Sequence, residues 1–125
     1  MRYPQVVVFE GDGRLAALLR PLAEGRRWPL REPRQLAPCL RLLARGGPAV
    51  VVIRAGRDLE REFTLLERLR WLFPEVRLLV VTDGDHPALA GLAWDLGADC
   101  VLSPHSAREL LPDVVAGLMG PPGKD

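Results

Sequence analysis

The stretch GPAVVVIRAGRD, residues 47–58, carries the pattern that decides the fold. Five apolar residues, most of them β-branched, run without interruption from Ala49 to Ile53. A continuous run of this kind is typical of a strand that is covered on both faces, as in a parallel sheet. The run leads directly into Arg54, where we expect the strand to end. In open α/β proteins ligands bind at this end of the strands, so a permanent cation there needs an explanation.

Four further segments have the composition of strands, and helical patterns separate them. The other expected strands are residues 5–9, 28–32, 77–81 and 99–102. The expected helices are residues 12–25, 34–47, 58–74, 86–97 and 106–120. Strand and helix therefore alternate five times. This alternation predicts a flavodoxin-like (βα)5 fold, with a doubly wound five-stranded parallel sheet in a three-layer α/β/α arrangement.

Composition limits the classes of partner. The 17 basic residues, all arginine except Lys124, are balanced by 16 acidic ones, which leaves a net charge of +1. No general attraction to nucleic acid or to an anionic membrane follows from that balance. Two cysteines, Cys39 and Cys100, form neither a disulfide framework nor a metal motif. No signal peptide is visible, and no apolar run approaches the roughly 20 residues that span a bilayer. We therefore expect a soluble cytoplasmic domain over residues 1–119, with a disordered tail or the start of a linker at 120–125, and no direct contact with nucleic acid or membrane.

Four quoted segments together resemble the receiver domain of bacterial two-component response regulators. They are VVVFEGD (6–12), PAVVVIR (48–54), LRWLFPEVRLLVVT (69–82) and LGADCVLSP (96–104). The resemblance covers residues 5–119 and rests on pattern and spacing more than on identity. It implies the same five-stranded fold and a role in signal transduction, including transcription regulation.

The departures from the family pattern concern its reactive residues. The resemblance implies Mg²⁺ held by an acidic pair and a phospho-accepting Asp, with a Lys that contacts the phosphoryl group. Here the acidic pair reads Glu10–Gly11, the acceptor position holds Arg54, and Ser103 or Pro104 stands at the lysine position. The degenerate pocket comprises Glu10, Gly11, Asp12, Arg54, Thr82, Ser103 and Pro104. The sequence therefore predicts a pseudo-receiver that keeps the fold, lacks the phosphoryl chemistry, is not an enzyme, and uses no cofactor or metal.

Arg54 suggests a replacement for the metal. A guanidinium offers five donors in a fixed fork and does not deprotonate. We expect it to pair with Glu10, with Asp12 as an additional partner; the alternative is that it extends into water. A divalent cation held by Glu10, Asp12, Asp83 and Asp85 is a further alternative. We consider it weaker than an ordinary turn at residues 82–85.

Apolar side chains outside the expected core indicate a partner surface. Leu110, Val114 and Leu118 are expected to fill the core from helix 106–120. The remaining exposed set is Trp94, Leu111, Val115 and Met119. The resemblance implies that helix 86–97, strand 99–102 and helix 106–120 form an output and dimer face, on which that set would lie.

The function predicted on these grounds is a phosphorylation-independent, receiver-like signalling module that acts through a protein partner or as a homodimer. The alternative is a flavodoxin-like sensor, in which the crevice around Glu10, Arg54 and Thr82 binds a small anion or a nucleotide. Residual phosphorylation on Asp58 or Asp12 is disfavoured, because Mg²⁺ would have to bind without the acceptor geometry of the family.

Overall fold

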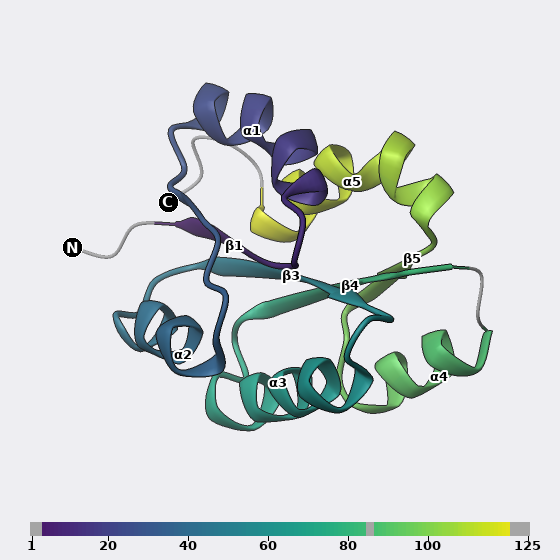
Figure 1. Ribbon diagram of the computed structural model, residues 1–125. Coiled ribbons are helices and arrows are strands. Elements are labelled where there is room, and N and C mark those ends of the chain that lie inside the picture. The colour runs from purple at the N-terminus through teal and green to yellow at the C-terminus, as the bar shows by residue number, and fades with distance from the viewer. Residues whose placement is uncertain (1–3, 85–86, 121–125) are drawn as a thin grey trace.

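One parallel sheet of five strands lies between two layers of helices in the computed structural model (Figure 1), which describes residues 4–84 and 87–120. The strands lie in the order β2-β1-β3-β4-β5. Their bounds are β1 Gln5–Phe9, β2 Leu30–Arg31, β3 Ala49–Ala55, β4 Arg77–Thr82 and β5 Cys100–Leu102. The helices are α1 Arg14–Arg26, α2 Leu36–Ala44, α3 Leu59–Leu72, α4 Pro87–Asp95 and α5 Pro104–Met119. The predicted (βα)5 fold is confirmed.

The two helical layers explain why the central strands lack alternation. Helices α1 and α5 cover one face of the sheet, and α2, α3 and α4 cover the other (Figure 1). Val50 and Val52 pack in the α1–α5 layer, whereas Val51 and Ile53 pack in the opposite one. Because both faces are buried, every position of the run must be apolar.

Strand β3 is longer than the apolar run indicates. Arg54 pairs with Val81 and Ala55 with Thr82, so the ladder continues two residues past Ile53. The backbone N–H of Asp83 extends the contact, donating to the carbonyl of Ala55 at 2.7 Å. Arg54 therefore lies inside the strand, and the period of two places its side chain on the α1–α5 face.

Helix α5 differs most from expectation. It begins at Pro104, because the Oγ of Ser103 caps it by accepting the N–H of Ser106 at 3.2 Å. Leu111 and Val115 are fully buried, while Leu110 is 46% exposed. The expected exposure of Leu111 and Val115 was therefore wrong, because both residues belong to the core rather than to a partner surface.

The spacing of small and large residues on α5 explains the difference. Ala107, Leu111 and Val115 recur every four residues and so share one helix face against the sheet. Val114, Leu118 and Met119 pack only at the margin of that core. On α4 the buried residue is Ala93, whereas Leu92 is 44% exposed.

Two parts of the sequence predictions concern residues that the structure does not describe. Asp85, the last residue of the expected turn at 82–85, and most of the tail, residues 121–125, lie outside the described residues. Over residues 4–84 and 87–120, no helix has the length and hydropathy that crossing a membrane requires.

Candidate functional site

Arg54 forms ion pairs with two aspartates from neighbouring loops. Its Nη1 donates to both carboxylate oxygens of Asp12, at 3.0 and 2.8 Å. Its Nε and Nη2 both donate to the Oδ1 of Asp83, at 3.2 and 2.8 Å. Only 15% of the Arg54 side chain is exposed. The expected pairing with Asp12 is thus confirmed, and the alternative that Arg54 extends into water is wrong.

Glu10 has a different task from the expected one. Its two carboxylate oxygens accept the backbone N–H groups of Leu15 and Ala16, at 3.0 and 2.9 Å. The N-cap of α1 is Gly13, which has no side chain to accept these first-turn donors. Glu10 therefore caps α1 from the end of β1. The predicted hydrogen-bonded pair of Glu10 with Arg54 was wrong, because the helix terminus occupies this carboxylate.

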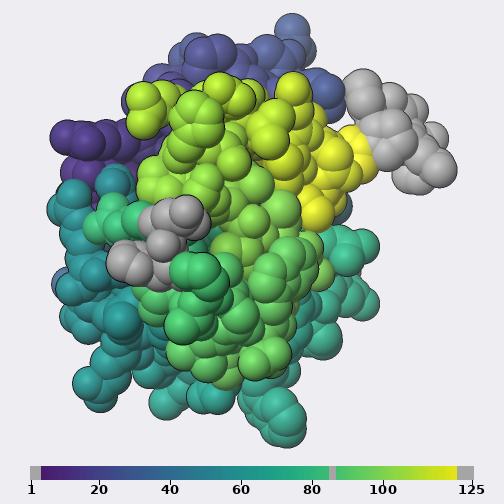
Figure 2. Space-filling model, turned by 90° about the vertical axis from the view of Figure 1, so that its right-hand side faces the viewer, coloured from purple at the N-terminus to yellow at the C-terminus, as the bar shows by residue number. Residues whose placement is uncertain are grey.

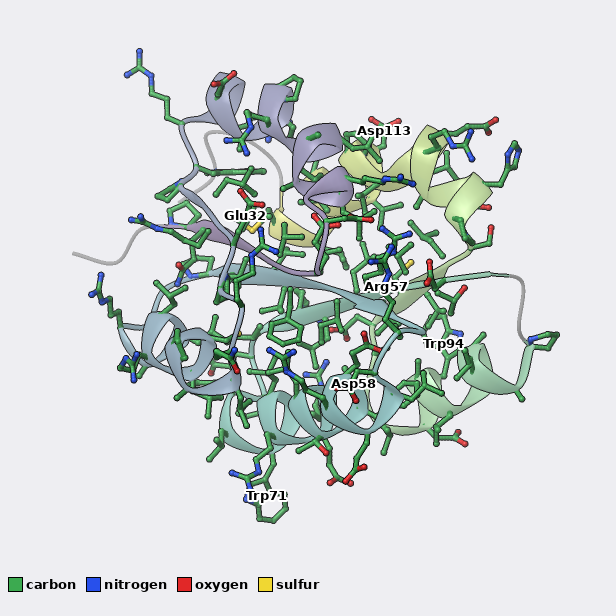
Figure 3. The ribbon with its side chains drawn as sticks, viewed as in Figure 1. Glu32, Arg57, Asp58, Trp71, Trp94 and Asp113 are labelled. Atoms are coloured by element: carbon green, nitrogen blue, oxygen red, sulfur yellow. The ribbon has the colours of Figure 1, made fainter. Side chains whose placement is uncertain are left out.

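A second guanidinium completes the charge balance. Arg57 donates from Nη2 to Asp12 at 3.2 Å, and its Nε lies 3.8 Å from the Oδ2 of Asp83. Figure 3 shows Arg57 at the carboxyl edge of the sheet, between the two helical layers. We call Asp12, Arg54, Arg57 and Asp83 the arginine–aspartate cluster. It holds two cations and two anions in alternating contact. The sequence prediction missed Arg57, although it follows the apolar strand by only a few residues.

The pKa shifts of Asp12 and Arg54 both favour the charged form of the side chain. The hydrogen bond from the Arg14 backbone lowers the pKa of Asp12; burial opposes this effect, and the charges of Arg54 and Arg57 add to it. Burial alone would lower the pKa of Arg54. Hydrogen bonding to Asp83 and the nearby carboxylate charges outweigh burial, so the pKa of Arg54 is raised above its ordinary value. Both partners are ionised throughout the physiological range.

The other residues of the expected pocket lie at the same edge but serve local structure. Thr82 is 4% exposed, and its hydroxyl donates to the carbonyl of Gly84 at 2.7 Å. The carbonyl of Gly11 accepts from Arg34 at 2.7 Å. Ser103 caps α5, and Pro104 is the first residue of that helix. The structure thus brings the expected residues together at one edge without joining them in one reactive site.

The residues present do not fit the Mg²⁺ that the receiver fold implies. The guanidinium of Arg54 lies between Asp12 and Asp83, where a cation would have to bind. Glu10 is engaged with α1. Among the described residues, no three His, Cys, Asp or Glu side chains lie together as potential metal ligands. Asp85, the fourth carboxylate of that alternative, lies outside the described residues.

The loop after Arg54 is fixed by a contact that the sequence prediction missed. Glu62 of α3 is 8% exposed, and its Oε1 accepts the backbone N–H of Gly56 at 2.8 Å. Gly56 has a φ of +147°, a conformation that favours glycine. Glu62 is one of two acidic residues in the first turn of α3, a position that favours acidic side chains, and this was the available sequence signal.

Comparisons with known proteins support the fold. No protein-family model matches the chain, and no match appears among curated proteins. A response regulator from Thermotoga maritima has a similar structure, with a TM-score of 0.76, 15% identity, and coverage of 94% of this chain and 99% of that one. The signal receiver domain of an HD domain-containing protein from Pseudomonas fluorescens Pf-5 gives a TM-score of 0.73 and 21% identity, covering 94% and 98%. The receiver domain of a Francisella response regulator gives a TM-score of 0.74 at 19% identity. The match covers 93% of this chain and 96% of that one.

The chain therefore has the fold of response-regulator receiver domains, as the sequence resemblance implies. At these identities the likeness concerns the fold. The chemistry has to be inferred from the arginine–aspartate cluster itself.

Proposed function

We propose that this domain is a phosphorylation-independent, receiver-like signalling module that acts through contact with a protein partner or a second copy of itself. One observation supports the proposal above all others. Arg54, at the position where the resemblance implies a phospho-accepting Asp, uses its fork to hold Asp12 and Asp83. A guanidinium that stays protonated is no nucleophile, so this position cannot accept a phosphoryl group.

The arginine–aspartate cluster also holds the carboxyl edge of the sheet in one arrangement, so that it does not switch between two states. A receiver that responds to phosphorylation needs two states that the new charge can bias. Here Arg54 joins β3 to the loops that follow β1 and β4, and the cluster is balanced without any ligand. Output then depends on the concentration of the partner rather than on phosphorylation.

Incubation with acetyl phosphate and Mg²⁺, followed by intact mass measurement, tests this proposal. We expect no mass gain of one phosphoryl group, and no rise of the melting temperature with Mg²⁺ alone. A receiver domain with an intact acceptor Asp, treated in parallel, shows that the reagent is active. A stoichiometric phosphoryl adduct on this chain would overturn the proposal.

We propose that the partner binds to the face formed by α4, β5 and α5, which is turned towards the viewer in Figure 2. Large apolar side chains remain exposed there: Leu92 by 44%, Trp94 by 51% and Leu110 by 46%. Met119, also expected on this surface, is only partly covered, whereas Leu111 and Val115 are core residues. Exposed tryptophan is enriched among the residues that dominate binding energy at interfaces.

Sedimentation velocity over a wide concentration range tests self-association through this face. We expect Trp94→Ala to weaken the dimer. Trp71→Ala serves as the matched control, because Trp71 is 84% exposed on α3 and points away from the sheet (Figure 3). If both variants associate like the wild type, the α4–α5 face is not the dimer surface. A chain that stays monomeric at every concentration would restrict the proposal to a different protein as partner.

A further inference from the structure

A cavity of about 240 Å³ opens between α1, α5 and the carboxyl ends of β3 and β4. Figure 1 shows α1 and α5 side by side on the same face of the sheet. The apolar part of its lining includes Leu15 and Leu18 of α1 and Val81 of β4. Arg14, Arg54 and Arg108 supply the charged part. The cavity thus combines an apolar floor with three guanidinium groups from three separate elements.

The charge of this lining is unbalanced, unlike that of the chain as a whole. Three of its nine residues are arginines and none is acidic, whereas the net charge of the protein is only +1. Arg108 forms no ion pair with any described residue. The side chain of Arg14 is 78% exposed and reaches Asp12 only at 3.6 Å. Two guanidinium groups are therefore available to a ligand, whereas Asp12 and Asp83 already neutralise the charge of Arg54 at the inner wall.

The start of α5 adds to the positive potential. Pro104 and Ala107, in the first turns of this 16-residue helix, line the cavity. The first turn contains no acidic residue that would neutralise the positive end of the helix dipole. Anions are favoured at such a terminus, and here the arginine side chains surround it.

From these features we infer that the cavity binds a small organic anion, with an apolar body on the leucine and valine floor and an anionic headgroup between Arg14 and Arg108. The volume is below the roughly 300 Å³ at which pockets for drug-sized ligands begin. It suits one aromatic ring or a short alkyl chain with a phosphate-ester or carboxylate headgroup, and is too small for a whole nucleotide. Glu10, expected in the crevice of a sensor, lies outside this cavity and lines a separate depression. The site goes beyond the proposed signalling function and does not depend on it.

Phenyl phosphate is a suitable probe, because it carries both an aromatic ring and a charged headgroup. Isothermal titration calorimetry at low salt, with the full chain, should show saturable one-to-one binding in the millimolar range or tighter. Inorganic phosphate and benzyl alcohol each present only half of the chemistry, and we expect both to bind at least about tenfold more weakly. Benzoate separates the two headgroup classes. Binding of phenyl phosphate without binding of benzoate indicates a phosphate ester, while tighter binding of benzoate indicates a carboxylate. Equal binding means that the site accepts either headgroup, and each of these results supports the site.

Variants test the location of the site. Arg108→Gln and Arg14→Gln should each weaken phenyl phosphate binding about threefold to tenfold, since each removes one charged donor. Arg41→Gln is the charge-matched control, because Arg41 is exposed on α2 in the opposite helical layer. Circular dichroism and the melting temperature verify that each variant is folded.

Two results would overturn the inference. One is binding of inorganic phosphate as tight as that of phenyl phosphate, which would mean that the apolar floor contributes nothing. The other is an equal loss of affinity in Arg41→Gln and Arg108→Gln, which would indicate attraction to overall charge. Neither result bears on whether the chain accepts a phosphoryl group, so this test and that of the signalling function fail independently.

Discussion

The guanidinium of Arg54 contacts Asp12 across 42 residues of sequence, with Nη1 donating to both carboxylate oxygens. The same guanidinium holds Asp83 on its other side. One side chain of the central strand thereby fixes the loops that follow β1 and β4. The resemblance implies a Mg²⁺ ion at this edge, held by an acidic pair and the acceptor Asp, whereas here a guanidinium of the chain is the cation beside Asp12.

Replacing Arg54 by methionine should therefore destabilise the domain. Arg54→Met keeps the length of the side chain but leaves the half-exposed Arg57 as the cation that Asp12 and Asp83 still share. Because the guanidinium is mostly buried, we expect the free energy of unfolding to fall by about 2 kcal/mol. Urea denaturation at neutral pH measures this change.

The same variant should become sensitive to Mg²⁺. With Arg54 removed, Arg57 alone neutralises the two carboxylates only in part, and a divalent ion relieves the remaining repulsion. Mg²⁺ is expected to raise the melting temperature of Arg54→Met but not that of the wild type. Arg57→Met is the control, since its side chain is 54% exposed and its loss should cost less than about 1 kcal/mol. An identical Mg²⁺ response in all three proteins would contradict the idea that Arg54 replaces the metal.

Gly56 should tolerate no side chain. A Cβ added there would overlap the Cβ of Asp83, and the φ of +147° is strained for any other residue. We expect Gly56→Ala to lower the free energy of unfolding by about 2–3 kcal/mol and to displace Asp83 from Arg54. Gly91→Ala is the matched control: no atom lies within 4 Å of its added Cβ, and α4 should gain helix propensity. Comparable losses of stability in Gly56→Ala and Gly91→Ala would show that the close approach of Gly56 to Asp83 does not cause the destabilisation.

Neighbouring leucines on α5 provide a direct test of which face of the helix is buried. Leu111 is fully buried, so Leu111→Ala should cost about 2–5 kcal/mol. Leu110 is 46% exposed, and Leu110→Ala should change stability by less than about 1 kcal/mol. Chemical denaturation of the two variants measures the difference. The reverse order of losses would restore the helix face that the sequence pattern alone suggests.

The strands were predictable because burial on both faces leaves an unmistakable pattern. Val50 to Ile53 must all be apolar when each neighbour contacts a different helical layer. The helix faces were harder to predict, because α4 and α5 are apolar on more than one side. On α5 the small residue Ala107 marks the buried stripe, but periodicity gives small residues little weight. As a result, Leu111 and Val115 were placed on the surface.

The candidate site was predictable in its location and only partly in its contacts. Parallel strands bring Glu10, Arg54 and Thr82 to one edge whatever their chemistry. The partners of each charge depend on loop conformations that no periodic pattern encodes. Glu10 accepts hydrogen bonds from α1, because Gly13 has no side chain to cap that helix. Asp83 lies within hydrogen-bond distance of Arg54 because of the turn after β4.

The buried thiol of Cys39 should make stability depend on alkaline pH. Burial raises the pKa of Cys39 from 9.0 to about 11. Below pH 9 the thiol is protonated in both the folded and the unfolded state, so the contribution of the buried Cys39 thiol to the free energy of unfolding is fully present. As the pH rises from 9 towards 11, only the unfolded chain releases this proton, so up to about 3 kcal/mol of stability is lost.

Urea denaturation at pH 7.5 and pH 10.5 isolates this effect when the wild type is compared with Cys39→Ala. The variant loses packing at both pH values but should lack the additional decline at pH 10.5. Cys100→Ala is the control, since Cys100 is only partly buried and should leave most of the wild-type decline in place. Parallel declines in the wild type and in Cys39→Ala would mean that other groups cause the alkaline loss. Such a result would also imply that α2 opens readily enough for the Cys39 thiol to ionise in the folded protein.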